Sequence, residues 1–253
     1  MDLHLQNKVA LVTGGSRGLG RAIALGLAQE GAKVAVNYSR HRQQAADLVD
    51  RIRREHAVDA IAVQASVTDS ADVVRMFGEC ESQLGPLDVL VNNAGTWPTA
   101  YVKDMTELQW DETLAVNLKG PFLAGREAVR RWLALGRTGR IVNISSQAAF
   151  MGSTTGHAHY AAAKAGLVAF TVSLAREVAP HGIYVNAVAP GFMRTDMIQE
   201  TLSTGEAQLL NRIPLRRIGD PAEVANTVVF LASDRASYTT GATFDASGGM
   251  LMR

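Results

Sequence analysis

Short apolar runs alternate with longer amphipathic segments along the whole chain of 253 residues. Runs rich in Val, Ile and Leu are typical of strands buried on both faces, whereas apolar residues spaced by three and four are typical of helices. No linker rich in Pro, Gly or Ser, no repeat and no low-complexity stretch interrupts this alternation. The pattern therefore predicts an α/β fold with a Rossmann-type, doubly wound parallel sheet, formed as a single domain over residues 1–253.

The expected elements follow from this alternation and from the turn residues between them. Strands are expected at Lys8–Thr13, Lys33–Asn37, Ala60–Gln64, Leu87–Val91, Arg140–Ser145, Tyr184–Val188 and Ala242–Asp245. Helices are expected from Leu19 to Gly31, at His41–Glu55 and Asp69–Leu84, within Glu107–Leu135, from Tyr160 to about Ala179, and from Pro221 onward. Polar clusters follow the strands, and in such sheets ligands bind outside the carboxyl ends of the strands.

Composition and charge exclude several classes of partner. Lys plus Arg total 25 and Asp plus Glu total 24, a formal net charge of +1, which argues against nucleic acid or an anionic membrane as the main partner. No apolar run reaches the 18 residues of a membrane span, and the N-terminus lacks the pattern of a signal peptide. The single cysteine, Cys80, fits a reducing compartment, so we expect a cytoplasmic protein.

The first expected strand runs into a glycine-rich turn at Thr13–Gly20, which leads directly into a helix. Its glycines, Gly14, Gly18 and Gly20, follow the spacing G-x-x-x-G-x-G. Glycines let the backbone approach phosphate groups closely, and the free N–H groups and dipole of a helix N-terminus attract them. The turn therefore predicts a dinucleotide site, although a strand followed by glycines is also found at plain tight turns.

The end of the second expected strand bears on which dinucleotide would bind. Enzymes that select NAD usually place an acidic residue there, to bond the ribose 2′-hydroxyl. This chain has Asn37, Ser39 and Arg40 in that region and no carboxylate. Arg40, with Arg17 from the glycine turn, could neutralise a 2′-phosphate, since arginine donors match phosphate well. We therefore expect NADP(H) as the preferred cofactor, with NAD(H) as the alternative.

Tyr160 and Lys164 are four residues apart in the segment Tyr-Ala-Ala-Ala-Lys, which places them on one face of a helix. A cation near a phenol favours the phenolate, so we expect Lys164 to lower the pKa of Tyr160. That would make the tyrosine a proton donor and acceptor. Without further evidence, the same spacing also fits a tyrosine that only packs against the protein and a lysine that is only a solvated surface charge.

Together these residues resemble the short-chain dehydrogenase/reductase family, and within it the 3-oxoacyl-(acyl carrier protein) reductases. The resemblance covers nearly the whole chain. It rests on Thr13–Gly20, Asn92-Asn93-Ala94-Gly95, Asn117, Ser146, Tyr160-Ala-Ala-Ala-Lys164 and Pro190-Gly191, in this order.

The resemblance implies roles for the matching positions. The catalytic group would be Asn117, Ser146, Tyr160 and Lys164: Ser146 binds the substrate carbonyl, Tyr160 gives it a proton, Lys164 also binds the nicotinamide ribose, and Asn117 positions a water. The cofactor would lie against Gly14, Ser16, Arg17, Gly18, Leu19, Gly20, Asn93, Ala94, Gly95, Pro190, Gly191, Met193 and Thr195.

The chain departs from the family pattern in its serine spacing, its adenine contact and its carrier-protein contact. Ser146 stands 14 residues before Tyr160 where the family has 13, with Ser145 as the alternative. Ser66 and Val67 occupy the adenine position, where an acidic residue or Asn is common. Two basic residues near the entrance are expected for docking a carrier protein. Arg137 fits the first of these positions, whereas His181 stands at the second. The substitution at the second position weakens the expectation that an acyl carrier protein docks here.

Other residues near the expected site have open interpretations. His157 and His159 match no zinc pattern, so we expect no metal and a polar loop lining the pocket. Trp97 could wall that pocket or simply pack. The stripe Leu167, Phe170, Leu174 and Val178 could face a partner subunit or the protein's own sheet.

The expected activity is reduction of a ketone to a secondary alcohol by NADPH, with a 3-oxoacyl thioester on carrier protein or CoA as substrate. The alternative is a dehydrogenase of a sugar, cyclic or other small secondary alcohol. The least favoured hypothesis is a non-catalytic regulator that binds the cofactor. The resemblance also implies a homotetramer in which the Asn117 and Tyr160 helices form one interface.

Overall fold

The computed structural model describes residues 2–153, 155–195, 207 and 209–252. Within them, seven strands form one parallel sheet in the order β3-β2-β1-β4-β5-β6-β7. The strands are β1 Val9–Val12, β2 Lys33–Tyr38, β3 Ala60–Gln64, β4 Val89–Asn92, β5 Gly139–Ile144, β6 Ile183–Pro190 and β7 Thr243–Ala246. The order reverses between β1 and β4, which confirms the predicted doubly wound sheet.

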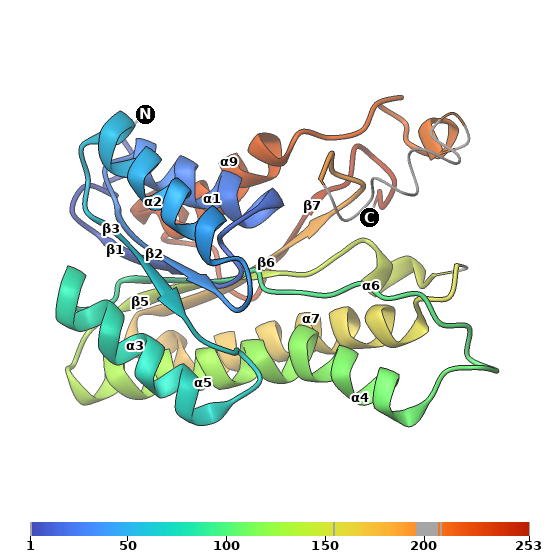
Figure 1. Cartoon of the computed structure of the whole chain (residues 1–253), viewed down its shortest axis with the longest axis horizontal. Helices are drawn as coiled ribbons and strands as arrows, with labels where there is room; N and C mark the ends of the chain where they lie inside the picture. Colours follow the sequence, from blue (N-terminus) through green and yellow to red (C-terminus); the bar gives the residue numbers. More distant parts are fainter. Residues whose placement is uncertain (1, 154, 196–206, 208, 253) are drawn as a thin grey trace.

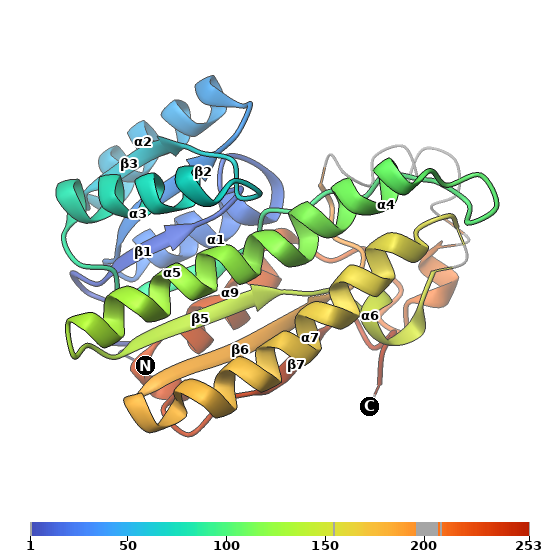
Figure 2. The ribbon, with the colours of Figure 1, turned by 90° about the horizontal axis from the view of Figure 1, so that it is seen from below.

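Helices cover both faces of the sheet, as Figures 1 and 2 show. Helices α1 (Gly18–Gln29), α2 (Arg42–His56) and α9 (Pro221–Ala232) pack on one face. Helices α3 (Ser70–Leu84), α5 (Gly120–Ala134) and α7 (Ala158–Val178) pack on the other. The remaining helical segments are α4 Glu107–Leu114, η1 Ala115–Lys119, α6 Ala148–Met151, η2 Ala179–His181 and η4 Asp234–Ala236.

The sequence explains several element boundaries. Asp69 caps α3 by accepting a hydrogen bond from the Asp72 backbone N–H, and Asp220 forms a capping box with Glu223 at the start of α9. Pro221 occupies the first turn of α9, where its missing N–H leaves no hydrogen bond unmade. These local signals set the starts of both helices.

The helix expected within Glu107–Leu135 is interrupted by a π-helical turn, η1, that contains Asn117. Such turns often occur at functional sites. The Asn117 side chain donates to the carbonyl oxygen of Thr113, four residues earlier, at 2.9 Å, so its amide bonds to the helix backbone itself. The chain pattern gave no sign of this turn, nor of the short helix α6.

The apolar stripe on α7 faces the protein's own sheet. Leu174 and Val178 belong to the core between the sheet and helices α3 and α5, and Leu167 has no exposed surface. Phe170 is partly buried and meets Phe122 of α5 edge to face. Of the two interpretations of this stripe, the internal one is correct.

Candidate active site

The glycine turn after β1 begins α1 with the features of a phosphate site. Gly14 and Gly18 have φ values of +60° and +53°, a backbone region that residues with a Cβ rarely adopt. The N-cap of α1, Arg17, makes no side-chain capping bond, and no acidic residue lies in the first turn. The helix N-terminus is therefore open to an anion, so these residues fit the pyrophosphate of a dinucleotide.

Neighbouring strand ends hold the glycine turn in place. The side-chain amide of Asn93 donates to the carbonyl oxygens of Thr13 (2.9 Å) and Gly14 (3.0 Å). A Cβ on Gly20 would lie 2.5 Å from the Asn93 amide nitrogen, so only glycine allows α1 to approach this closely. The predicted residues Asn93, Ala94, Gly14 and Gly20 therefore form one contiguous structure.

Asn37 also supports the turn. Its side-chain oxygen accepts from the Gly14 N–H at 3.1 Å, and its amide donates to the carbonyl oxygens of Val63 (3.3 Å) and Ala65 (3.1 Å). The residue is buried, with 2% of its surface exposed. Its amide thus ties three strand ends together, and contact with a cofactor remains a prediction for this residue.

The other predicted cofactor residues surround this turn at the carboxyl edge of the sheet. Ser39, Arg40 and Arg17 are exposed, and Ser66 and Val67 follow β3, with Val67 buried against Gly120. Pro190 ends β6, and a Cβ on Gly18 would lie 3.5 Å from the Thr195 methyl group. The remaining residues are Ser16, buried in the turn, Leu19, partly buried in the first turn of α1, and Gly191 and Met193, which follow β6.

Ser146, Tyr160 and Lys164 meet beyond the end of β5. The Ser146 hydroxyl lies close enough to the Tyr160 hydroxyl to lower its pKa. The Ser146 oxygen also accepts from the Ala148 backbone N–H at 3.1 Å. The Lys164 ammonium lies 5.6 Å from the centre of the Tyr160 ring and donates to the Ile144 carbonyl oxygen at 2.7 Å.

The two serines have separate roles in this arrangement. Ser145 donates to the Lys164 backbone carbonyl at 3.1 Å and so points into the protein. Ser146 instead lies next to the Tyr160 hydroxyl, whose pKa it lowers. The longer spacing is taken up by the loop that contains α6, so the prediction of Ser146 over Ser145 agrees with the geometry.

Burial sets the protonation of this group. It raises the pKa of Tyr160, an effect that the Ser146 hydrogen bond opposes, and it lowers the pKa of Lys164 to about 8. The prediction that Lys164 lowers the pKa of Tyr160 is therefore wrong for the chain by itself. The loss of solvation outweighs the opposing effect of Ser146, and the Tyr160 hydroxyl stays protonated at neutral pH.

Asn117 lies beside this group but is engaged by the loop after β4. Its amide donates to the Thr96 carbonyl oxygen at 2.9 Å, and its oxygen accepts from the Thr96 N–H at 3.3 Å. A Cβ on Gly95 would lie 2.9 Å from the Asn117 oxygen and 3.8 Å from the Lys164 nitrogen. The absent Cβ leaves space next to Lys164, which fits a cofactor ribose at this position.

The two histidines are not a polar lining, so that prediction is wrong. His159 is fully buried, and among the described residues neither of its ring nitrogens has a hydrogen-bond partner. His157 is 3% exposed and stacks on Trp97. Burial, with a smaller effect of His159, lowers the pKa of His157 to about 4, so its ring is neutral at physiological pH.

The carrier-protein residues are not near the catalytic group of the same chain. Arg137 and His181 each stand two residues before the paired residues Gly139 and Ile183, at the amino ends of β5 and β6. Ser146 follows the opposite end of β5. The prediction that both basic residues lie near the entrance is therefore wrong within one chain, because a full strand separates them from it.

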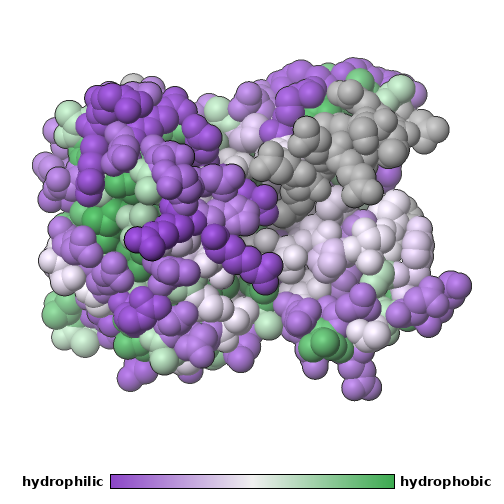
Figure 3. Space-filling model, viewed as in Figure 1, coloured by the Kyte–Doolittle hydropathy of each residue, from purple (hydrophilic) through white to green (hydrophobic). Residues whose placement is uncertain are grey.

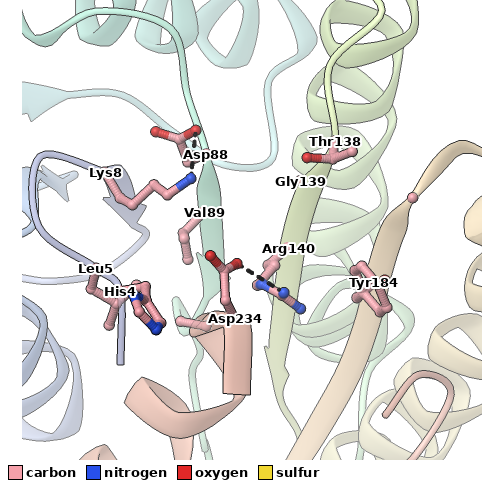
Figure 4. A pocket seen from close by; sticks show the side chains of 12 residues that line it. His4, Leu5, Lys8, Asp88, Val89, Thr138, Gly139, Arg140, Tyr184 and Asp234 are labelled. Carbon is pink, nitrogen blue, oxygen red and sulfur yellow. Dashed lines mark hydrogen bonds and ion pairs between the residues drawn. The ribbon is translucent and has the colours of Figure 1, made fainter. Parts of the chain in front are cut away.

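A cavity of about 40 Å³ opens near that amino edge (Figure 4). Its walls include the ion pairs Lys8–Asp88 (4.0 Å) and Arg140–Asp234 (3.1 Å), and the Arg140 guanidinium stacks on the Tyr184 ring. The cavity shares no residue with the candidate active site.

Comparison with known proteins agrees with this geometry. A family model described as "Enoyl-(Acyl carrier protein) reductase" matches residues 14–251. A 3-oxoacyl-[acyl-carrier-protein] reductase FabG of Staphylococcus aureus (strain Mu50 / ATCC 700699) is 47% identical over 245 residues, 97% of this chain and 98% of the relative. The chain belongs to the short-chain dehydrogenase/reductase family. It is an NAD(P)-dependent oxidoreductase that acts on CH–OH groups.

Further relatives show how widely this scaffold is used. A FabG of Aquifex aeolicus is 42% identical, covering 99% of this chain and 100% of its own. A solved structure from Agrobacterium tumefaciens, described as a candidate gluconate dehydrogenase, has a TM-score of 0.94 and is 36% identical, covering 100% of this chain and 99% of its own. A short-chain type dehydrogenase/reductase from Mycobacterium marinum has a TM-score of 0.95 at 32% identity, covering 100% and 98%.

Proposed function

We propose that this protein reduces a 3-oxoacyl thioester, on carrier protein or CoA, to the 3-hydroxyacyl thioester with NADPH. The observation that carries the proposal is the grouping of Ser146, Tyr160 and Lys164 beyond the end of β5, at the same sheet edge as the glycine turn. The identity to 3-oxoacyl reductases supports the substrate class.

The proposed mechanism uses the protonation found at the site. The glycine turn and Lys164 would hold NADPH, which would supply the hydride for the ketone carbon. Negative charge then develops on the ketone oxygen, and the hydroxyls of Ser146 and Tyr160 are donors already arranged to stabilise it. The raised pKa of Tyr160 keeps its proton available until the alkoxide takes it. Lys164, charged below about pH 8, would stabilise the tyrosinate that remains.

The preference for NADPH rests on the region after β2. No carboxylate stands between Asn37 and Arg40, and the Arg40 side chain is exposed at the carboxyl edge of the sheet. Arg40 and Arg17 would then share the 2′-phosphate of NADPH, whereas NADH would gain nothing from them.

The first experiment is NADPH oxidation, read by absorbance, with acetoacetyl-CoA beside a panel of simple, cyclic and sugar ketones. Fast turnover of acetoacetyl-CoA relative to the panel is expected. Turnover only on a sugar or cyclic ketone would favour the dehydrogenase alternative, which the resemblance to the Agrobacterium structure also allows. Tight NADPH binding without turnover of any of them would favour a regulator.

We also propose a homotetramer. The helices that carry Asn117 and Tyr160 lie side by side on one face (Figure 2). Exposed apolar side chains occur along α4 and α5: Leu108, Trp110, Phe122 and Leu133. Covering them would remove apolar surface from water. Light scattering is expected to give four times the chain mass of 27.0 kDa, and a monomeric mass would contradict the proposal.

Among the described residues, no helix is long and apolar enough to cross a membrane. We also propose that the reaction is carried out in the cytoplasm, a reducing compartment that suits the single cysteine, Cys80.

A further inference from the structure

Trp97 borders the candidate active site from the loop after β4. It lies two residues beyond Gly95, whose absent Cβ leaves space next to Lys164. Its stacking partner His157 precedes Tyr160 by three residues and is the N-cap of α7. One helical turn therefore separates the stack from the proton donor.

The backbone on both sides of Trp97 is fixed. On one side, Thr96 makes its two backbone hydrogen bonds with the Asn117 side chain. On the other side, the Thr99 hydroxyl bonds the His157 Nε2 at 3.0 Å, and the Ala100 N–H donates to the Gly156 carbonyl oxygen at 2.8 Å. Trp97 is thus held between two anchor points, so its ring position is set by the fold and not by a bound ligand.

The ring of Trp97 joins two parts of the protein. It stacks on His157 with 4.0 Å between ring centres and 10° between planes. The Thr155 hydroxyl, 3.0 Å from Nδ1, holds the other side of the imidazole. Trp97 also packs against an apolar cluster from the C-terminal third of the chain, which consists of Leu209, Ile213 and Ile218. Phe192, Leu210 and Met250 pack against the same cluster.

The surface around this region agrees with an apolar lining. Hydrophilic side chains gather over α1 and α2 in Figure 3, whereas the part over α6 and the start of α7 is paler. In α6, which follows Ser146, Phe150 and Met151 are 36% and 53% exposed. Exposed apolar groups therefore also occur in the segment between Ser146 and the start of α7.

We propose that Trp97 and the apolar cluster form one wall of a subsite for an unbranched alkyl chain attached to the ketone carbon. A polyhydroxylated substituent would lose hydration against this wall without gaining hydrogen bonds, and would be rejected. The inference rests on the proposed reduction of an acyl thioester, because it assigns the place of the acyl chain. His157 is a positioning residue for Trp97.

The test is the dependence of kcat/KM on chain length in two substrate series. The first series is 3-oxoacyl-CoA with four to eight acyl carbons, and the second is 2-alkanones from butanone to octanone, which need no thioester. In the wild type, kcat/KM is expected to rise by up to about fourfold for each methylene buried against the wall.

Two variants examine the wall directly. Trp97→Ala is expected to flatten the rise of kcat/KM with chain length, with the loss appearing in KM more than in kcat. Trp97→Phe retains a flat ring on His157 and is expected to restore part of the rise, which also covers the case in which the alanine variant fails to fold. Tyr238→Ala, at a fully exposed aromatic residue, is the matched control and should leave the profile unchanged.

The outcomes separate this inference from the proposed function. Thioester turnover without any dependence on chain length, or with the same dependence in Trp97→Ala, would overturn the subsite and leave the function intact. A rise for 2-alkanones that Trp97→Ala abolishes, without thioester turnover, would support the subsite and overturn the function. If kcat/KM does not depend on chain length in either substrate series, the subsite is overturned.

Discussion

Replacing Lys164 with methionine should abolish activity and change how stability depends on pH. The Lys164 side chain is 4% exposed, and burial lowers its pKa from 10.5 to about 8. Charging the amine in the folded chain therefore costs about 3 kcal/mol more than in the unfolded chain, at 1.36 kcal/mol per pH unit. The lost hydrogen bond to the Ile144 carbonyl offsets about 1–3 kcal/mol of this. At pH 7 the variant is thus expected to be up to about 2 kcal/mol more stable.

The pH dependence has a definite sign. Because the pKa is lower in the folded state, the wild type carries the full penalty below about pH 8, where both states are charged. As the pH rises from about 8 towards 10.5, the folded state loses its proton first and stability increases. Between pH 7 and pH 10 the wild type should gain about 2–3 kcal/mol of stability relative to Lys164→Met.

The assay is urea unfolding of both proteins without cofactor, at one protein concentration, at pH 7, 8, 9 and 10. Taking the difference between the two proteins cancels every other titrating group. Lys103→Met, at a side chain that is 84% exposed, is the control and should run parallel to the wild type. Parallel curves for wild type and Lys164→Met would refute the argument that burial controls this amine.

Other substitutions test the remaining members of the site. Tyr160→Phe should lower kcat by about 100-fold or more and leave the NADPH dissociation constant, measured by fluorescence titration, nearly unchanged, since only the proton is lost. Substantial retained turnover would contradict its role. Ser146→Ala should lower kcat by about 100–1000-fold, whereas Ser145→Ala should mainly lower stability by about 1 kcal/mol. The reverse result would show that Ser145, and not Ser146, has the catalytic role. Arg40→Ala should raise the KM for NADPH by about tenfold or more and barely change that for NADH, and equal losses would remove the case for the 2′-phosphate.

The sequence was most informative where function depends on local spacing. The strand–glycine–helix pattern at residues 9–29 and the four-residue spacing of Tyr160 and Lys164 are short-range properties of the chain. Periodicity likewise predicted the parallel sheet, because strands buried on both faces must be apolar throughout. The start of α3 was identified to within one residue, since capping is also local.

Predictions that needed contacts between distant segments were less successful. Trp97 and His157 are 60 residues apart in the chain, and no local pattern shows that their rings stack. The engagement of the Asn117 amide by Thr96, and of Asn37 by the ends of β1 and β3, likewise became visible only when the strands were assembled.

The amino-acid sequence by itself determined the family and the fold and predicted the candidate catalytic side chains, because these follow from residue type and from spacing within single elements. Tertiary structure decided their physical state. Tyr160 keeps its proton and Lys164 lies close to losing one, because folding removes both from water. It also decided which serine faces the tyrosine and which surface the stripe of α7 covers. Solvation and packing are properties of the assembled chain, since each depends on atoms supplied by several elements at once.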